Sequence, residues 1–130
     1  MKRYETVYQM VKKESHLYNM KLLPSPYAEL SDIFTTHEPT YATNYMNGKL
    51  SAAQNRKIGF PWSEAFVYRT RYIVGGTVAS VHDVLSKRAV IAGNLAGGTH
   101  HAFREHGEGY CIFNDIGIAA NVAKRVKLMI

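Results

Sequence analysis

The sequence has a single cysteine, Cys111, among 130 residues, so no disulfide can form within the chain. It has no uninterrupted apolar run long enough to cross a bilayer. Its first residues, Met1 to Glu5, carry charge where a secretory signal would need an apolar segment. These absences argue against a membrane-spanning or secreted protein. We therefore expect a cytoplasmic protein, or a nuclear one if the source is eukaryotic.

Acidic residues are outnumbered, with 10 Asp and Glu against 16 Lys and Arg, which gives a net charge of +6. The basic residues are spread from Lys2 to Lys127 instead of being concentrated on one helix or loop, as nucleic-acid binding would favour. We therefore interpret them as solvated surface and expect no nucleic-acid partner. The hydrophobic content of 46% is ordinary for one globular domain.

Hydrophobic periodicity and capping residues predict mainly helices. The expected helices cover residues 4–14, 28–34, 36–48, 64–87 and 115–125. The longest has an apolar stripe made by Val67, Val74, Val78, Val81 and Leu85. Gly75 and Gly76 interrupt this helix, which indicates close approach by another backbone or a kink. In the last helix we expect Ile116, Ala119, Ala120 and Ala123 to face inward.

Two short apolar runs predict strands, one at Ala89–Ala92 and one beginning at Leu128. Helix, strand, loop, helix, strand is half of a doubly wound parallel sheet, so we predict an α/β fold. Two parallel strands make a poor independent core, so such a fold would be incomplete here.

The loop from Asn94 to Asp115 is the predicted functional site. It follows the first predicted strand and leads into the last helix, and open α/β sheets place chemistry at the carboxyl ends of their strands. Gly97 and Gly98 allow a sharp turn that would present His100 and His101.

Several motifs in this chain resemble the histone-deacetylase superfamily, in particular its bacterial and class IV-like branch. They are Gly97-Gly98-Thr99-His100-His101-Ala102, Gly109-Tyr110-Cys111-Ile112-Phe113-Asn114-Asp115, Ile58-Gly59-Phe60-Pro61-Trp62-Ser63, Arg69 through Gly75-Gly76-Thr77, and His37-Glu38-Pro39-Thr40-Tyr41. The likeness runs from about Tyr4 to the last residue, with the motifs in the family's order.

The resemblance implies a partial arginase/deacetylase-like three-layer α/β/α fold with a parallel sheet. Residues 1–130 would be an incomplete N-terminal portion of the catalytic domain, truncated at the C-terminal end and lacking the family's first strand. The strand beginning at Leu128 would continue into an Asp-x-His metal-ligand motif, so all metal ligands are expected after Ile130.

The activity that the resemblance implies is hydrolysis of the amide of acetylated lysine or a related acylated amine by a zinc (or iron) enzyme. His101 would be the general base and acid, and His100 its electrostatic partner. Gly109 would face the substrate amide, and Tyr110 would line the acyl-lysine tunnel. Because its metal ligands are missing, we expect the 130-residue chain alone to bind no metal stably and to be inactive.

Each of these residues also has a simpler interpretation. His100 and His101 could be loop histidines bonded to backbone, or could bind a metal together with His106. Cys111 could be a nucleophile, but a small buried thiol is commoner. Asn114-Asp115 could simply cap the following helix. His16, His37 and His82 look structural or solvated, and Trp62 looks like a packing anchor.

Three functions therefore remain open: part of a deacylase, a catalytically inactive remnant acting as a binding module, and a small histidine-loop metalloprotein. We also expect self-association through the cut edge of the sheet, because unpaired strand edges seek partners.

Overall fold

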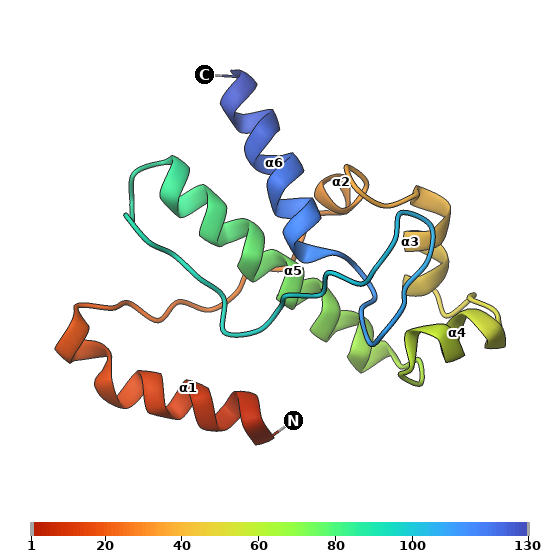
Figure 1. Ribbon diagram of the computed structural model, residues 1–130, viewed down its shortest axis with the longest axis horizontal. Helices are drawn as coiled ribbons and strands as arrows, with labels where there is room; N and C mark the ends of the chain where they lie inside the picture. The colour runs from red at the N-terminus through yellow and green to blue at the C-terminus, as the bar shows by residue number, and fades with distance from the viewer. Residues whose placement is uncertain (1, 130) are drawn as a thin grey trace.

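The computed structural model describes residues 2–129. The secondary-structure elements longer than an isolated bridge in this part of the chain are all helices. They are α1 (Lys2–Glu14), the 3₁₀ helix η1 (Ser15–Tyr18), α2 (Leu30–Ile33), α3 (Pro39–Met46), α4 (Ala52–Ile58), α5 (Glu64–Leu85) and α6 (Asp115–Met129). Figure 1 shows α5 running through the middle of the molecule, α6 extending away from it, and α1 set apart from the other helices. None of the described helices is long and apolar enough to span a membrane.

The central helix α5 forms as predicted, ending two residues early. The Ser63 hydroxyl caps it by accepting the Phe66 N–H at 3.1 Å. A Cβ added at Gly75 would collide with the carbonyl oxygen of Pro26. The glycine therefore allows the linker before α2 to lie against the helix, as the close-approach prediction required. The predicted stripe is buried at its first three valines, but Leu85 is exposed.

Helix α6 also forms, and the prediction of its inward face is confirmed for Ala119 but wrong for Ile116 and Ala120. Ile116 is 53% exposed, whereas Ile118, Ala119 and Val122 are buried. The rotation is set by Asp115, whose side chain is buried by its bonds to the preceding loop, so the residues three, four and seven positions later face inward with it.

The predicted strands do not form among residues 2–129. Ala89–Ala92 is irregular, with Val90 and Ile91 exposed by 93% and 88%. At Leu128, helix α6 simply continues to Met129. A strand needs a neighbour to take up its backbone hydrogen bonds, and the described residues offer none to either run. The described part of the chain therefore has no parallel sheet.

The remaining helices are short or exposed. Helix α3 occupies the middle of the predicted 36–48 segment. Helix α4 was not predicted, although Ser51 and Gln54 form a capping box at its start. Helix α1 forms as expected but has no buried residue.

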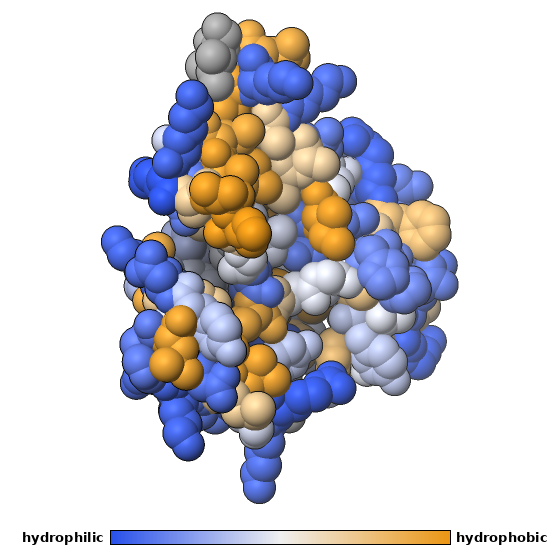
Figure 2. Space-filling model, turned by 60° about the vertical axis from the view of Figure 1, so that its left-hand side comes forward, coloured by the Kyte–Doolittle hydropathy of each residue, from blue (hydrophilic) through white to orange (hydrophobic). Residues whose placement is uncertain are grey.

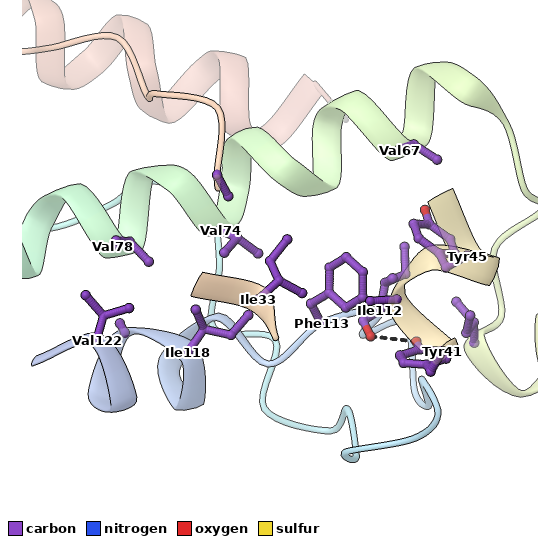
Figure 3. Close-up of a cluster of buried hydrophobic side chains, with 14 of the residues drawn as sticks. Ile33, Tyr41, Tyr45, Val67, Val74, Val78, Ile112, Phe113, Ile118 and Val122 are labelled. Carbon is purple, nitrogen blue, oxygen red and sulfur yellow. Dashed lines mark hydrogen bonds between the residues drawn. The ribbon is translucent and has the colours of Figure 1, made fainter. Parts of the chain in front are cut away.

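The core lies between α5, α6, α2 and α3, and the end of the histidine loop enters it. Figure 3 shows Phe113 lying among side chains from α2, α3 and α5. Phe113 is 1% exposed, and its ring packs edge-on against Tyr41 and Tyr45 at centroid distances of 5.9 and 5.7 Å. The buried Tyr41 hydroxyl donates to the carbonyl oxygen of Ile112 at 2.7 Å. The core thus fixes the chain immediately before α6.

Candidate active site

The start of the loop that carries the histidine pair is anchored on α5 by Asn94. The Asn94 amide nitrogen donates to the carbonyl oxygen of Ile73 at 2.8 Å and to the hydroxyl of Thr77 at 3.0 Å. Its amide oxygen accepts the N–H of Ala96 at 3.3 Å. One side chain therefore ties the chain that leads into the glycine bend to the middle of the central helix.

The bend itself is held by the buried carboxylate of Asp115. Oδ2 accepts from Thr77 Oγ1 at 2.7 Å and from the Gly98 N–H at 3.1 Å. Oδ1 accepts from the Thr99 N–H at 2.8 Å and lies 2.9 Å from the Thr99 hydroxyl. Burial by itself would raise the pKa of Asp115, but these hydrogen bonds stabilise the carboxylate more strongly, and its pKa lies below the ordinary value.

The far side of the loop is held by His37, which is fully buried. Its Nε2 accepts the backbone N–H of Asn114 at 2.9 Å, so Nδ1 carries the proton and donates to the carbonyl oxygen of Arg104 at 3.3 Å. Burial lowers the pKa of His37, which favours this neutral form. Of the two interpretations left open for this residue, the structure supports the structural one.

His100 and His101 lie on the outside of this anchored bend. Both side chains are exposed, and their ring centroids are 4.2 Å apart. Nδ1 of His100 is 2.9 Å from the carbonyl oxygen of Gly98. This is the backbone bond of the simpler interpretation, and it involves only one of the ring's two nitrogens. Gly97 and Gly98 have φ values of +113° and +76°, which glycine adopts without strain.

Gly109 and Tyr110 lie beside the histidine pair. A Cβ added at Gly109 would be 3.4 Å from Cβ of His101, so the two segments are in close contact. Tyr110 has a φ of +65°, unusual for a bulky residue, and its N–H donates to the carbonyl oxygen of Ile58 at 2.7 Å. Such backbone conformations are found preferentially at functional sites. The tyrosine ring is 65% exposed and packs edge-on against Phe60.

The described residues do not provide a metal site. Among residues 2–129 no three His, Cys, Asp or Glu side chains are grouped so that they could hold an ion. His106 stacks on Phe103 at 4.4 Å, and its Nε2 lies 3.5 Å from Glu108, so it does not join the histidine pair. The hypothesis of a metal site made by His100, His101 and His106 was therefore wrong. The donor set present here does not fit the zinc or iron that the family resemblance implies.

The other residues singled out in the sequence have structural surroundings. Cys111 is 6% exposed, as a small buried thiol would be. The Asn114 side chain caps α6 by accepting the Gly117 N–H at 2.8 Å. Trp62 is 37% exposed, and its indole N–H donates to the carbonyl oxygen of Tyr45 at 2.6 Å.

Sequence reasoning missed the roles of Asn94, Thr77 and Asp115 in holding the bend. In the structure the Asn114 side chain caps α6, which leaves the neighbouring Asp115 carboxylate free to hold the bend.

The fold resembles that of a solved deacetylase relative. The chain superposes on the crystal structure of an HDAC homologue from Aquifex aeolicus with a TM-score of 0.67 and 23% identity, over 78% of this chain and 29% of the other. At that identity the likeness shows the fold. The chain therefore has part of an HDAC-type fold.

The sequence comparisons give the family. The model of the histone deacetylase domain matches residues 1–130, and the chain belongs to the histone deacetylase family. It is 45% identical over 89 residues to an uncharacterized protein of Picosynechococcus, covering 68% of this chain and 29% of that protein. It is 36% identical over 77 residues to the acetoin utilization protein AcuC of Bacillus subtilis (55% and 20%), and 44% identical over 46 residues to histone deacetylase clr6 of Schizosaccharomyces pombe (35% and 11%). The chain thus spans less than a third of the length of each of these relatives.

Proposed function

We propose that this chain is part of a metal-dependent deacylase that hydrolyses the amide of acetylated lysine or a related acylated amine. The observation that carries the proposal is the pair of adjacent, exposed imidazoles on a glycine bend, held from behind by the buried Asp115 carboxylate. Membership of the histone deacetylase family supports the reaction class, and one relative is named a histone deacetylase.

His101 is the proposed general base and acid. Amide hydrolysis requires removal of a proton from the attacking water and its delivery to the departing amine, and one imidazole can do both. His101 is the member of the pair that lies against Gly109, where the backbone of the Gly109-Tyr110 segment could face a substrate amide. His100, with Nδ1 held at the carbonyl of Gly98, is the proposed electrostatic partner. The exposed ring of Tyr110 would line the entry of the acyl chain.

In enzymes of this kind a zinc or iron ion polarises the amide carbonyl. Because the described residues do not supply its ligands, we propose that the ion is held by residues outside these 130. The isolated chain is then expected to show no turnover, since it carries the proton-transfer groups without the metal.

A binding module without catalytic activity is the second candidate. It is favoured by the same lack of a ligand group among residues 2–129, together with the large exposed side chains of Val90 and Ile91. The two candidates differ in whether the histidine pair supports turnover once a metal-binding part is supplied.

A chimeric enzyme distinguishes the deacylase from the binding module. The chain would replace the part of the Aquifex homologue on which it superposes, and hydrolysis of an acetylated-lysine peptide would be measured as kcat/KM. We expect an active chimera in which His101→Ala lowers kcat/KM by about 10²–10⁴-fold, the usual contribution of general acid–base catalysis.

The matched control is His16→Ala, because His16 is an exposed histidine in η1, outside the proposed machinery. It should leave kcat/KM unchanged. Thermal melting and metal content would show that each chimera is folded and loaded. A folded, metal-loaded chimera without turnover would favour the binding module, and full activity in His101→Ala would refute the assigned role.

A further inference from the structure

Tyr110 differs from the other large hydrophobic side chains on the surface of the molecule. Exposed hydrophobic side chains are common in proteins, and Figure 2 shows several groups of them among hydrophilic residues on one face. Tyr110 is exposed as well, but its φ of +65° is unfavourable for a bulky side chain. A residue keeps such a conformation only where the surrounding structure imposes it. Specific contacts must therefore hold Tyr110 in place.

Gly109 and Tyr110 are the two central residues of a tight turn. The residues on either side of them, Glu108 and Cys111, exchange two backbone hydrogen bonds at 3.0 and 2.9 Å. Gly109 has a φ of +55°, and positive φ at both central positions is the pattern of a type I′ turn. Glycine suits such a position, whereas tyrosine does not. The turn therefore needs support from outside its own sequence.

The support comes from the C-terminal end of α4. The last carbonyl groups of a helix have no partner within the helix. The carbonyl oxygen of Ile58 accepts the Tyr110 N–H at 2.7 Å. The carbonyl oxygen of Lys57 accepts the Gly109 N–H at 3.3 Å. The Lys57 ammonium also lies 3.9 Å from the carboxylate of Glu108, where the turn begins. The turn is thus seated on the end of this helix.

Gly59, the C-cap residue of α4, gives the tyrosine ring its room. Gly59 has a φ of +95°, and a Cβ added to it would lie 2.8 Å from Cε1 and 3.0 Å from Cδ1 of Tyr110. The ring therefore lies directly against the Gly59 backbone, which only a residue without a side chain allows. The ring also packs edge-on against Phe60, with centroids 5.1 Å apart. A side chain at residue 59 would displace the ring.

The same turn touches the histidine pair. A Cβ added at Gly109 would be 3.4 Å from Cβ of His101, so the seat on α4 fixes the tyrosine relative to the proposed general base. We propose that Gly59 is a positioning residue: it places the Tyr110 ring against the acyl chain of the substrate, and so sets substrate affinity without taking part in proton transfer. The inference rests on the proposed function for the role of Tyr110.

Gly59→Ala in the chimeric enzyme tests the effect on substrate binding. The dissociation constant of a fluorescently labelled acetylated-lysine peptide would be measured by anisotropy, which requires no turnover. We expect Kd to rise about 3–10-fold, the fold-change that corresponds to losing one aromatic contact. Where turnover is present, KM should rise by a similar factor while kcat stays within about twofold, as when an interaction made equally with substrate and transition state is lost.

Two comparisons separate the tyrosine ring from backbone strain. Gly48→Ala is the matched control, because Gly48 has a φ of +68° and its added Cβ would lie 3.1 Å from the ring of Trp62, outside the turn. This variant should leave Kd unchanged. In the Tyr110→Ala background, Gly59→Ala should have no further effect on Kd, since the ring that the new Cβ displaces is gone. Strain from alanine at φ +95° is the same in both backgrounds.

The seat itself can be measured in the 130-residue chain by NMR. Nuclear Overhauser contacts should join the ring protons of Tyr110 to the Hα protons of Gly59, and the Tyr110 amide should be protected from hydrogen exchange. Absence of these contacts would overturn the inference. If Gly59→Ala lowers the yield of folded chimera, Phe60→Leu removes the neighbouring ring and should also weaken peptide binding only when Tyr110 is present.

An unchanged Kd in Gly59→Ala, or an increase of equal size in the Tyr110→Ala background, would overturn the inference. A folded, metal-loaded chimera that does not bind the peptide would do the same. The expected pattern of Kd without turnover would leave the inference standing and count against the proposed function. Turnover that depends on His101, with KM unchanged in Gly59→Ala, would support the proposed function and refute the inference.

Discussion

Replacing Asp115 by asparagine should destabilise the chain and loosen the histidine bend. Each carboxylate oxygen accepts from a backbone N–H, Oδ1 from Thr99 and Oδ2 from Gly98. Whichever way the asparagine amide turns, its NH₂ group meets one of these donors and leaves it unpaired. An orphaned buried donor costs roughly 1–3 kcal/mol, and the weaker bonds to a neutral acceptor bring the expected loss to about 2–5 kcal/mol.

Urea unfolding followed by circular dichroism measures this loss as a change in the free energy of unfolding. The control is Asp83→Asn, which removes a pair with the largely exposed Arg88 and should cost less than about 1 kcal/mol. If Asp115→Asn leaves too little folded protein, Thr77→Val removes one hydroxyl, which donates to the same carboxylate and accepts from Asn94, and should cost about 1–2 kcal/mol. An Asp115→Asn variant as stable as the control would show that the carboxylate does not hold the bend.

The lowered pKa of the Asp115 carboxylate also predicts that the free energy of unfolding falls in acid. Because the folded-state pKa of Asp115 lies below its ordinary value of 3.8, its contribution is complete above that value and is lost as the pH falls through the folded-state pKa. The Asp115→Asn variant should lack this part of the acid loss.

Three further results are expected. Gly75→Ala should cost more than about 1 kcal/mol, because its Cβ meets the carbonyl oxygen of Pro26, whereas Gly93→Ala, with no atom within 4 Å of the new Cβ, should be neutral in the same urea assay. Tyr41→Phe should cost about 0.5–1.5 kcal/mol, since it removes a buried hydroxyl donor and leaves a carbonyl oxygen unpaired; an unchanged denaturation midpoint would contradict this. Burial lowers the folded-state pKa of His37, so its contribution to stability is complete above 6.5 and declines as the pH falls toward that lower pKa; His37→Gln should remove this slope.

Helices could be predicted from sequence where local signals agreed. For α5, the Ser63 cap and the apolar stripe gave the start and the first buried valines correctly. For α6, the sequence pattern predicted the helix but not which of its faces is buried. Small or apolar residues lie on more than one face, so several faces could turn inward about equally well. The rotation was decided by a tertiary interaction, the burial of Asp115 against the loop.

The strands were mispredicted for a different reason. An apolar β-branched run such as Val90-Ile91 has the local preference for a strand, but strand formation depends on a neighbouring chain that the described residues do not provide. Local preference therefore identified a segment able to pair, and the structure shows it unpaired.

The exposed histidines of the candidate site could be predicted from the sequence, but the side chains that hold their loop in place could not. His100 and His101 could be singled out because their motif is local, and the structure places His101 against Gly109. The supporting groups could not be found, since Thr77 and Asp115 are 38 residues apart and nothing in either local sequence indicates the other.

The polar side chains that anchor the histidine loop explain how this exposed loop keeps a defined shape without extensive packing. Asn94 fixes its start to α5, Asp115 joins the bend to α5 and α6, and His37 fixes its return to the segment before α3. All three are polar side chains that bond to backbone groups, so the loop is positioned by directional contacts and the two histidine rings remain outside. A residue that transfers protons must be reachable by substrate and still be held in place. Anchoring from behind meets both requirements, which is why the Asp115→Asn experiment bears on the proposed chemistry as well as on stability.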